Sequence, residues 1–342
     1  MGLVGLAPRL AINGGRGLKQ GQNNGLVLGK FMPPHAGHQY LCDFARAASS
    51  ELTILVCSLP DDPIPGKQRA AWMAELYPDC RVVWCNEIVP QEPAEDPQFW
   101  PIWKNLIARH VGEVASVFAS ESYGHRLASE LSARFVPCDP MRIAIPTSAT
   151  AIRADPFASW SYIPRPVRPW FVKRVCLFGP ESSGKTTLAE QLAQVFATVA
   201  LPEYGRTWTE NFGVDVDERA LKEIADGHRA SRAAALRAAN RILIEDTDPI
   251  LTCVWADMLL GQRQSWMQDA LDPADLYLLT DIDFDWVDDG TRYFTNDTQR
   301  QRFHALCENE LINRNLPYLK ISGDPETRLA SAVSAIRARY AL

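Results

Sequence analysis

The 342-residue chain lacks the features that would direct it into a membrane or out of the cell. No apolar run approaches the roughly 18 residues that a membrane-spanning helix needs. Residues 1–24 have neither the cationic start nor the continuous apolar core of a secretory signal, and they lack the Ser/Thr expected for myristoylation. We therefore expect no membrane insertion, and we expect residues 1–24 to be a glycine-rich, disordered tail.

Paired cysteine motifs and excess positive charge are missing as well. The eight cysteines are scattered with no Cys-x-x-Cys, and most lie in apolar, strand-like runs. This pattern favours reduced, buried thiols in a cytoplasmic protein over a disulfide framework or a zinc site. A net charge of −6 gives no general attraction to nucleic acid. Any binding of phosphate groups must therefore rely on local positive sites.

What is present is the composition of a globular protein long enough for two domains, with 46% hydrophobic and 22% charged residues. Strand-like runs alternate with helical patterns in both halves, which predicts an α/β fold with two doubly wound parallel-sheet domains. Three prolines between Pro164 and Pro169 interrupt the pattern. We expect a first domain over 25–165, a proline-rich linker over 166–171 and a second domain over 172–342. The expected elements are strands over 26–31, 52–58, 81–85, 115–119, 135–138, 175–178, 198–201, 242–248, 276–280 and 318–321, and a long helix over 220–241.

The strongest motif is a glycine, four free positions and then Gly-Lys-Thr, which lies between an apolar run and a helical pattern. A strand, loop and helix in this order direct backbone N–H groups and a helix N-terminus at one point, where the polyphosphate of ATP can bind. Lys185 would reach the β- and γ-phosphates, and the Thr186 hydroxyl would be a ligand of Mg²⁺. The residues of this P-loop are Gly179, Pro180, Glu181, Ser182, Ser183, Gly184, Lys185, Thr186 and Thr187.

Acidic residues follow two later strands of the second half. Glu203 comes after the expected strand over 198–201, where a carboxylate can bind a ribose hydroxyl or remove its proton. A surface ion pair with Arg206 is the alternative. Asp246 ends an apolar strand in the manner of a Mg²⁺-positioning acid, and Asp248 could instead hold the substrate.

The segment 281–292 contains five aspartates, a tryptophan, a glycine and an arginine. This composition suits a mobile lid, in which Arg292 reaches the transferring phosphoryl group and acids such as Asp289 attract a cationic substrate. A merely solvated acidic loop is the alternative.

In the first half, His35 and His38 follow a strand and a proline pair at the start of a helical pattern. Residues three apart share a helix face, and open parallel sheets bind ligands at this place. Gly37 removes a side chain between the two imidazoles, so that a phosphate can approach the backbone. A second phosphate site is expected near the end of this half, where Ser148 and Thr150 begin a short helix that carries Arg153.

These two motifs resemble those of the nucleotidyltransferase superfamily, which are His-x-Gly-His and Ile-Ser-x-Thr-x-Ile-Arg. The second motif departs here, because Pro146 and Thr147 stand between Ile145 and Ser148. The resemblance implies that catalytic residues bind the ATP phosphates and stabilise charge at the α-phosphorus: Lys30, His35, His38 and Arg153. The remaining ATP-binding residues would be Gly29, Phe31, Gly37, Ser120, Ser148 and Thr150.

The run Phe99-Trp100-Pro101-Ile102-Trp103 resembles the aromatic segment of archaeal-type nicotinamide mononucleotide (NMN) adenylyltransferases. The resemblance implies that Trp103 stacks on the cationic nicotinamide ring. A buried structural tryptophan is the alternative. Arg69 is similar to a phosphate-side arginine of that family, and residues 120–124 are similar to its adenosine-side loop.

The whole chain from Gly25 onward resembles the NadR-type bifunctional NMN adenylyltransferases and ribosylnicotinamide kinases. The kinase half of that family is matched in order by Gly-Pro-Glu-Ser-Ser-Gly-Lys-Thr, Glu-Tyr-Gly-Arg, Glu-Asp-Thr-Asp and Asp-Trp-Val-Asp-Asp-Gly-Thr-Arg. Enteric members carry an N-terminal repressor domain; this chain shows none, so no DNA-binding role is expected. The resemblance implies a ribosylnicotinamide site made by Glu203, Tyr204, Arg206, Asp248, Trp255, Trp286 and Asp289.

The expected function is therefore two ATP- and Mg²⁺-dependent steps in a cytoplasmic enzyme of NAD biosynthesis. The second half would phosphorylate ribosylnicotinamide to NMN, and the first would transfer AMP to NMN, giving NAD and pyrophosphate. Partners would be small molecules only, and a homo-oligomer is left open. Two alternatives stand: a P-loop kinase fused to another nucleotidyltransferase, such as one acting on phosphopantetheine, and a nucleotide-sensing regulatory protein with a weak transferase site.

Overall fold

The computed structural model describes residues 23–268, 272–283, 293 and 296–342. The predicted site residues Trp286, Asp289 and Arg292 lie outside these ranges. Contacts divide the chain into two compact units between Ala149 and Thr150. Each unit is an α/β fold built on a five-stranded parallel sheet, which confirms the predicted fold class. The predicted domain limits at 165 and 172 stay a prediction.

The first unit contains a sheet with the strand order β3-β2-β1-β4-β5. All neighbouring strands pair in parallel, for example Leu26 with Thr53 and Val117 with Phe135. A parallel pair needs a crossover, and helices supply it here. The elements are β1 (Asn24–Gly29), α1 (Ala36–Ala48), β2 (Glu51–Cys57), α2 (Gly66–Leu76), β3 (Arg81–Cys85), α3 (Phe99–His110), β4 (Ser116–Ala119), α4 (Tyr123–Glu130) and β5 (Arg134–Pro137).

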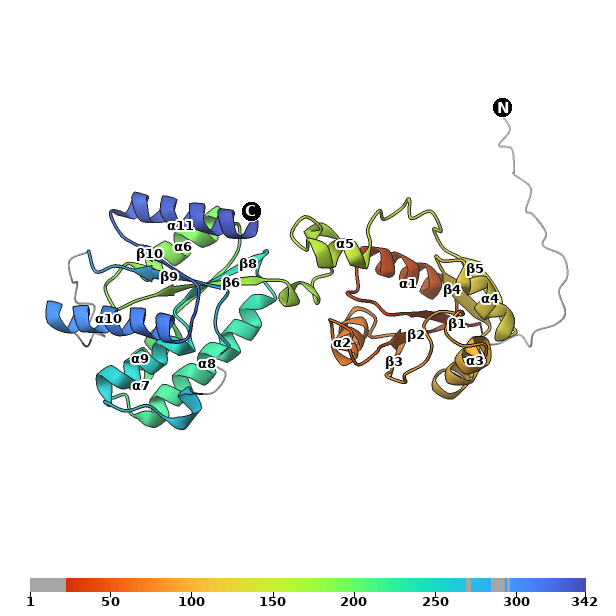
Figure 1. Ribbon diagram of the computed structural model, residues 1–342, viewed down its shortest axis with the longest axis horizontal. Coiled ribbons are helices and arrows are strands. Elements are labelled where there is room, and N and C mark those ends of the chain that lie inside the picture. Colours follow the sequence, from red (N-terminus) through yellow and green to blue (C-terminus); the bar gives the residue numbers. More distant parts are fainter. Residues whose placement is uncertain (1–22, 269–271, 284–292, 294–295) are drawn as a thin grey trace, which may run out of the picture. The chain divides into compact units, whose positions relative to one another are not determined.

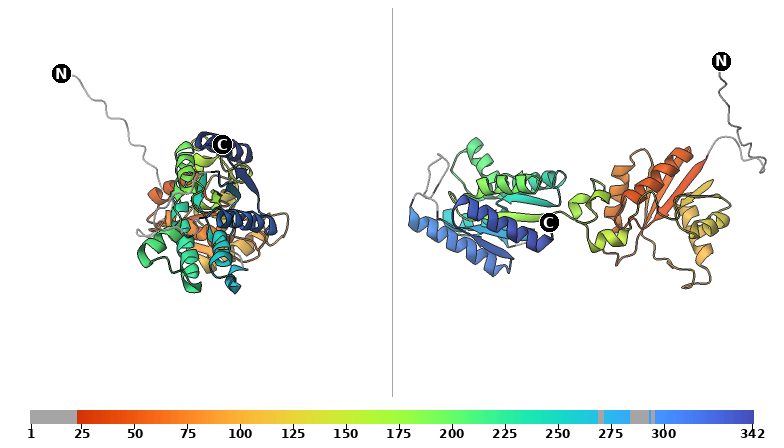
Figure 2. Two further views of the ribbon diagram at one scale, coloured as in Figure 1. Left: turned by 90° about the vertical axis from the view of Figure 1, so that its left-hand side faces the viewer. Right: turned by 90° about the horizontal axis from the view of Figure 1, so that it is seen from above.

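The sheet of the first unit is covered on both faces, which is why β1 and β2 are largely apolar. One core contains Cys42 and Ala45 of α1 and Met73 of α2, packed against β1 and β2. The other contains Leu106 of α3 and Leu127 of α4. The ribbon views show helices on either side of this sheet (Figures 1 and 2).

The second unit contains a sheet with the strand order β10-β9-β6-β8-β7, again entirely parallel. The strand that leads into the P-loop, β6, lies at its centre. The elements of this unit are α5 (Ala149–Ala154), the 3₁₀ turns η1 (Trp160–Tyr162) and η2 (Arg168–Trp170), β6 (Lys173–Phe178), α6 (Lys185–Val195), β7 (Ala200–Leu201), α7 (Tyr204–Phe212), α8 (Glu218–Leu236), β8 (Ile242–Asp246), α9 (Pro249–Leu259), η3 (Ser265–Met267), β9 (Leu276–Thr280), α10 (Asp297–Asn313), β10 (Tyr318–Ile321) and α11 (Pro325–Tyr340).

Two helical layers also enclose the second sheet. Leu188 and Leu192 of α6 pack with Ala332 and Ile336 of α11 on one face. Residues of α8, α9 and α10 form the other core, and Figure 1 shows these helices on the opposite side of the sheet. Among the described residues, no helix is both long and apolar enough to cross a membrane. All eight cysteines are free thiols, and seven of them are buried, as predicted.

The expected helix over 220–241 has the wrong limits. It starts earlier, because the Asp217 side chain accepts a hydrogen bond from the N–H of Ala220 at 2.8 Å and caps the helix. It ends at Leu236, and Arg241 then adopts a left-handed backbone (φ 63°) that no right-handed helix contains. The strand expected over 198–201 is also shorter, since β7 covers only Ala200–Leu201.

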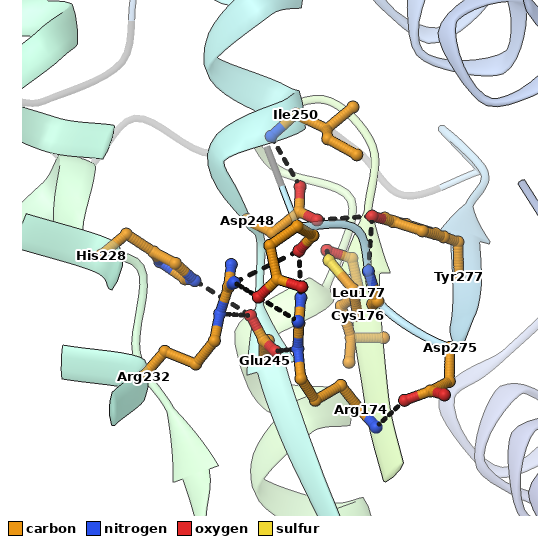
Figure 3. A network of polar contacts seen from close by, with 12 residues as sticks. Arg174, Cys176, Leu177, His228, Arg232, Glu245, Asp248, Ile250, Asp275 and Tyr277 are labelled. Carbon is orange, nitrogen blue, oxygen red and sulfur yellow. Dashed lines mark hydrogen bonds and ion pairs between the residues drawn. The ribbon is translucent and has the colours of Figure 1, made fainter. Parts of the chain in front are cut away.

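A buried charged cluster joins three elements beneath the second sheet's carboxyl edge (Figure 3). The Glu245 carboxylate on β8 is fully buried and accepts from Arg174 Nε of β6 at 2.5 Å and from Arg232 Nε of α8 at 3.1 Å. It also lies 3.0 Å from Nε2 of His228. Asp272 pairs with both guanidinium groups at 2.8 and 2.9 Å. Burial acts to raise the pKa of Glu245, but His228, Arg174 and Arg232 together lower that pKa to about 2.

We predict that Glu245→Gln lowers the free energy of unfolding of the second unit by about 3–5 kcal/mol, because two arginines lose their buried counter-charge. Urea unfolding followed by tryptophan fluorescence at pH 7 measures this loss. The folded pKa of Glu245 is lowered, so its contribution is present above the unfolded pKa of about 4.3 and is lost as pH falls towards 2. The difference between wild type and variant should therefore shrink over that range.

The matched control is Asp226→Asn on the exposed face of α8, which removes the same charge from a solvated pair with Lys222. It should change stability by about 1 kcal/mol or less. Equal losses in the two variants would contradict the structural role given to Glu245.

Candidate functional sites

The P-loop joins β6 to α6, and two glycines shape it. Gly179 has φ 143° and Gly184 has φ 78°, values that residues other than glycine rarely adopt. A Cβ on Gly179 would also lie 2.6 Å from the Thr280 hydroxyl and 3.0 Å from its carbonyl oxygen. Lys185 starts α6, and its ammonium group donates to the Pro180 carbonyl oxygen at 2.6 Å. The loop is thus a closed turn with its lysine folded over it.

Neighbouring elements support the backbone of this loop from behind. Ser183 Oγ donates to the Pro180 carbonyl oxygen at 2.7 Å and lies 2.7 Å from the Thr280 hydroxyl. The buried guanidinium of Arg328 on α11 donates to the carbonyl oxygens of Ser183 at 2.7 Å and of Asp281 at 3.0 Å, and it also pairs with Asp283. No sequence pattern pointed to Arg328, because an arginine in an amphipathic helix ordinarily faces water.

The two predicted metal ligands meet at the edge of the P-loop. The Thr186 hydroxyl donates to Oδ2 of Asp246 at 2.5 Å. Oδ1 of Asp246 is buried and has no hydrogen-bond partner among the described residues. A hydroxyl and a carboxylate with an unsatisfied oxygen are ligands that Mg²⁺ prefers, so the residues present fit this ion.

A cavity of about 380 Å³ opens in front of the P-loop. Glu203 occupies the N-cap position of α7, but its side chain makes no capping hydrogen bond. Its carboxylate is therefore available to the cavity. Burial raises the pKa of Glu203 to about 7; Lys185 opposes this shift and the Asp246 carboxylate adds to it. A carboxyl that titrates near neutral pH beside a phosphate-binding loop suits proton transfer.

The other described residues that we predicted to bind ribosylnicotinamide lie at the same cavity, but one of them already has other hydrogen-bond partners. Tyr204, Arg206, Asp248 and Trp255 all line it. Asp248, however, caps α9 by accepting from the N–H of Ile250 at 2.9 Å and accepts from the Tyr277 hydroxyl at 2.5 Å, as Figure 3 shows. Both of its oxygens therefore already have partners, and its predicted contact with substrate stays a prediction.

Aromatic side chains form one wall of the cavity. The Trp255 ring lies 5.4 Å from the ring of Tyr293 and 4.7 Å from that of Phe303, edge to face in both cases. The Tyr293 N–H donates to the carboxylate of Glu181 in the P-loop at 3.2 Å. The sequence reasoning did not assign Tyr293, because its neighbours in the chain offered only a loop. It also missed His228, which lines the cavity while contacting Glu245.

In the first unit, the two histidines meet as the spacing predicted. His35 caps α1, and its ring centroid lies 3.8 Å from that of His38. Nδ1 of His35 accepts from the N–H of Gly37 at 3.1 Å, which places the proton of the neutral ring on Nε2. Burial, followed by the charge of Arg142, lowers the pKa of His35 to about 4; burial, His35 and Arg142 also lower the pKa of His38. Both rings are therefore neutral donors at pH 7.

The residues around this pair are tightly placed. A Cβ on Gly37 would lie 3.0 Å from two atoms of the His35 ring. Phe31 is buried, and its ring centroid lies 4.9 Å from that of His38. Lys30 is partly exposed and forms an ion pair with Asp62 at 3.7 Å.

Two residues assigned by resemblance are buried in the structure. Arg69 is fully buried; it pairs with Asp62 at 2.5 Å and donates to the carbonyl oxygens of Ile64, Lys30 and Cys57. Trp103 is 8% exposed and donates to the Pro90 carbonyl oxygen at 2.9 Å. Both side chains act as structural elements here, and their predicted contacts with NMN stay predictions.

The predicted second phosphate motif straddles the division between the units. Ser148 precedes α5, and the Arg153 guanidinium lies 3.4 Å from the Thr150 hydroxyl. Ser120 directly follows β4, at the carboxyl edge of the first sheet. Arg142, which the sequence reasoning missed, acts electrostatically on both histidines and pairs with Glu121 at 2.9 Å.

Comparisons with known proteins agree with this arrangement. Residues 174–328 match the family described as an AAA domain. The trifunctional NAD biosynthesis/regulator protein NadR of Escherichia coli (strain K12) is 29% identical over 344 residues, which cover 93% of this chain and 84% of that protein. The protein of the same name from Salmonella typhimurium is 29% identical over 341 residues, covering 92% of this chain and 83% of the relative.

Two solved structures share the fold of almost the entire chain. The crystal structure of NadR protein in complex with NR has a TM-score of 0.76 at 23% identity, and it covers 94% of this chain and 97% of that one. The complex of NadR protein with NAD and AMP-PNP has the same TM-score and coverage at 24% identity. The match over almost the whole chain and the motifs of both halves make this chain similar to the NadR proteins.

Proposed function

We propose that this chain is a bifunctional enzyme of NAD biosynthesis that converts ribosylnicotinamide to NMN and then to NAD, using ATP and Mg²⁺ in both steps. Residues 172–342 would be the kinase domain and residues 25–165 the adenylyltransferase domain, with 166–171 as linker. Solved relatives bind NR, and NAD together with AMP-PNP. The observation that carries the proposal is that the P-loop, Thr186 and Glu203 line one cavity, with the Thr186 hydroxyl also hydrogen-bonded to Asp246.

In the kinase step, Glu203 would accept the proton of the ribose 5′-hydroxyl. The hydroxyl oxygen then bonds to the γ-phosphorus of ATP, the bond from that phosphorus to the bridging oxygen breaks, and ADP leaves. Lys185 would move from the Pro180 carbonyl oxygen to the β- and γ-phosphates, because phosphate oxygens bind an ammonium group more strongly than a neutral carbonyl does. Thr186 and Asp246 would hold Mg²⁺, which neutralises the charge that develops on the phosphates.

The substrate would bind against the aromatic wall of the cavity. Its nicotinamide ring is a flat cation, which favours the faces of Trp255 and Tyr293. Arg206 and Tyr204 line the same space.

In the transferase step, a phosphate oxygen of NMN would bond to the α-phosphorus of ATP, and pyrophosphate would leave as the α–β bridge breaks. The neutral rings of His35 and His38 would donate N–H groups to the ATP phosphates, and Lys30, Arg142 and Arg153 would supply positive charge. No covalent intermediate is needed, since positioning and electrostatics suffice.

The first test is to incubate the purified protein with ribosylnicotinamide, ATP and Mg²⁺ and to follow NMN and NAD by chromatography. Formation of both compounds supports the proposal. NMN and phosphopantetheine are then compared as acceptors of AMP, because turnover of phosphopantetheine alone would assign the first half to another nucleotidyltransferase. Binding of ATP without any turnover would favour a regulatory protein.

We predict that Lys185→Ala abolishes phosphorylation of ribosylnicotinamide and leaves adenylylation of NMN intact, and that His38→Ala has the opposite effect. The reason is that each side chain serves one nucleotide only. Both activities are measured separately, each with its own substrate. Lys222→Ala, on the exposed face of α8, is the control and should alter neither activity. Loss of both activities from one folded variant would contradict two separate sites.

We also predict that kcat/KM for ribosylnicotinamide falls below about pH 7, with a slope of one on a logarithmic plot. Burial raises the folded pKa of Glu203 to about 7, and only the ionised carboxylate can accept the proton. Glu203→Gln should lower kcat by roughly 10²–10⁴-fold and remove this acidic limb. A variant that keeps the wild-type pH profile would show that another group is the base.

A further inference from the structure

A glycine in the middle of α8 contacts the wall of the kinase cavity. Gly227 stands near the centre of this 19-residue helix, where glycine is about 1 kcal/mol less favourable than alanine. Its backbone is not among those with positive φ, so helix geometry alone does not require glycine there. We therefore expect a neighbour of Gly227 that leaves no space for a side chain at this position.

That contact is the ring of Tyr204. A Cβ on Gly227 would lie within 2.5 Å of three ring carbons of Tyr204. Atoms that are not covalently linked do not approach this closely, and an aromatic ring is too rigid to yield as a flexible chain end does. The Tyr204 ring therefore occupies the space that any side chain at position 227 would take.

This Tyr204–Gly227 contact lies beside the groups that perform the proposed chemistry. Tyr204 is the first residue of α7 and directly follows Glu203; both line the cavity. Glu203 makes no side-chain hydrogen bond to its own helix. The direction in which the Glu203 carboxylate points thus depends on where the first turn of α7 lies.

The other side of the contact is held firmly. His228, the residue after Gly227, and Arg232, one turn later, both contact the buried Glu245 carboxylate on β8. Figure 3 shows these two side chains reaching Glu245 from the same helix. The helix face that Tyr204 packs against is therefore fixed to the central part of the sheet.

We propose that Gly227 is a positioning residue of the kinase site: by leaving room for the Tyr204 ring, it fixes the start of α7 and so places Glu203 for the ribose hydroxyl. This proposal rests on the kinase activity proposed above. It concerns a residue that touches neither substrate nor nucleotide and acts only through Tyr204.

The decisive experiment is a double-mutant cycle with Gly227→Ala, Tyr204→Ala and the pair of substitutions together. Gly227→Ala should raise KM for ribosylnicotinamide or lower kcat by about tenfold or more, while KM for ATP changes less than about threefold. In the Tyr204→Ala background the same substitution should change these constants less than about twofold, because the ring that it displaces is absent.

A pH profile separates positioning from a general loss of packing. If the Tyr204 ring is displaced, more water reaches Glu203, and the acidic limb of kcat/KM in Gly227→Ala should move to lower pH. Asp226→Ala, at the adjacent exposed position of α8, is the matched control and should keep wild-type constants and the wild-type limb. Adenylylation of NMN serves as an internal control for intact protein.

Stability measurements make the outcome independent of the assigned substrate. Gly227→Ala should lower the urea midpoint in the wild-type background and raise or preserve it in the Tyr204→Ala background, whatever the enzyme phosphorylates. If Gly227→Ala fails to fold and the double variant folds, the contact is confirmed. Equal effects of Gly227→Ala in both backgrounds, an unchanged pH limb in the folded single variant, or two variants that both fail to fold would overturn the proposal. Absence of riboside turnover in the wild type would instead refute the proposed kinase function.

Discussion

The parallel arrangement of every strand pair in both sheets is the constraint on which the two sites depend. Each strand in such a sheet must be followed by a crossover, so the loops that leave the strands collect at one edge. In the second unit this edge receives the P-loop after β6, Glu203 after β7, Asp246 at the end of β8 and Thr280 at the end of β9. In the first unit it receives the loop between β1 and α1, where the histidine pair lies. The parallel topology thus brings functional groups that are far apart in the sequence to the same edge of a sheet.

Buried charges then fix the elements that form the kinase cavity. Glu245 draws Arg174, Arg232 and His228 together, so α8 is held against β8. On the other side of the P-loop, Arg328 binds the loop's backbone from α11. Such pairs contribute little net stability compared with apolar side chains, but each has directional hydrogen bonds. These ion pairs therefore fix the positions of α8 and the P-loop rather than adding much stability. The residues that these elements present to the cavity are positioned as a result.

Glycine supports function in this chain in two different ways. Gly179 and Gly184 are needed for their backbone conformations, which no side chain tolerates well. Gly37 and Gly227 have no positive φ, and a neighbouring ring limits the space at each instead: a Cβ would lie 3.0 Å from the His35 ring at Gly37 and 2.0 Å from the Tyr204 ring at Gly227. The first kind leaves a recognisable sequence pattern. The second kind depends on a neighbour elsewhere in the fold, and for Gly227 that neighbour is 23 residues away in the chain.

The sequence by itself determined the fold class, most strands, the P-loop and the histidine pair, because these follow from local periodicity and from motifs whose residues are contiguous. It also placed Glu203 near the P-loop through its position after a strand, and the family resemblance added Tyr204 and Trp255; all three line one cavity. Only the tertiary structure decided which polar groups are already satisfied. Asp248, Arg69 and Trp103 look free for ligands in the sequence, yet their partners are carbonyl oxygens, hydroxyls and carboxylates from other elements. The structure likewise revealed Tyr293, Arg328 and Gly227, since burial and packing between distant segments are properties of the assembled chain and not of any one stretch of it.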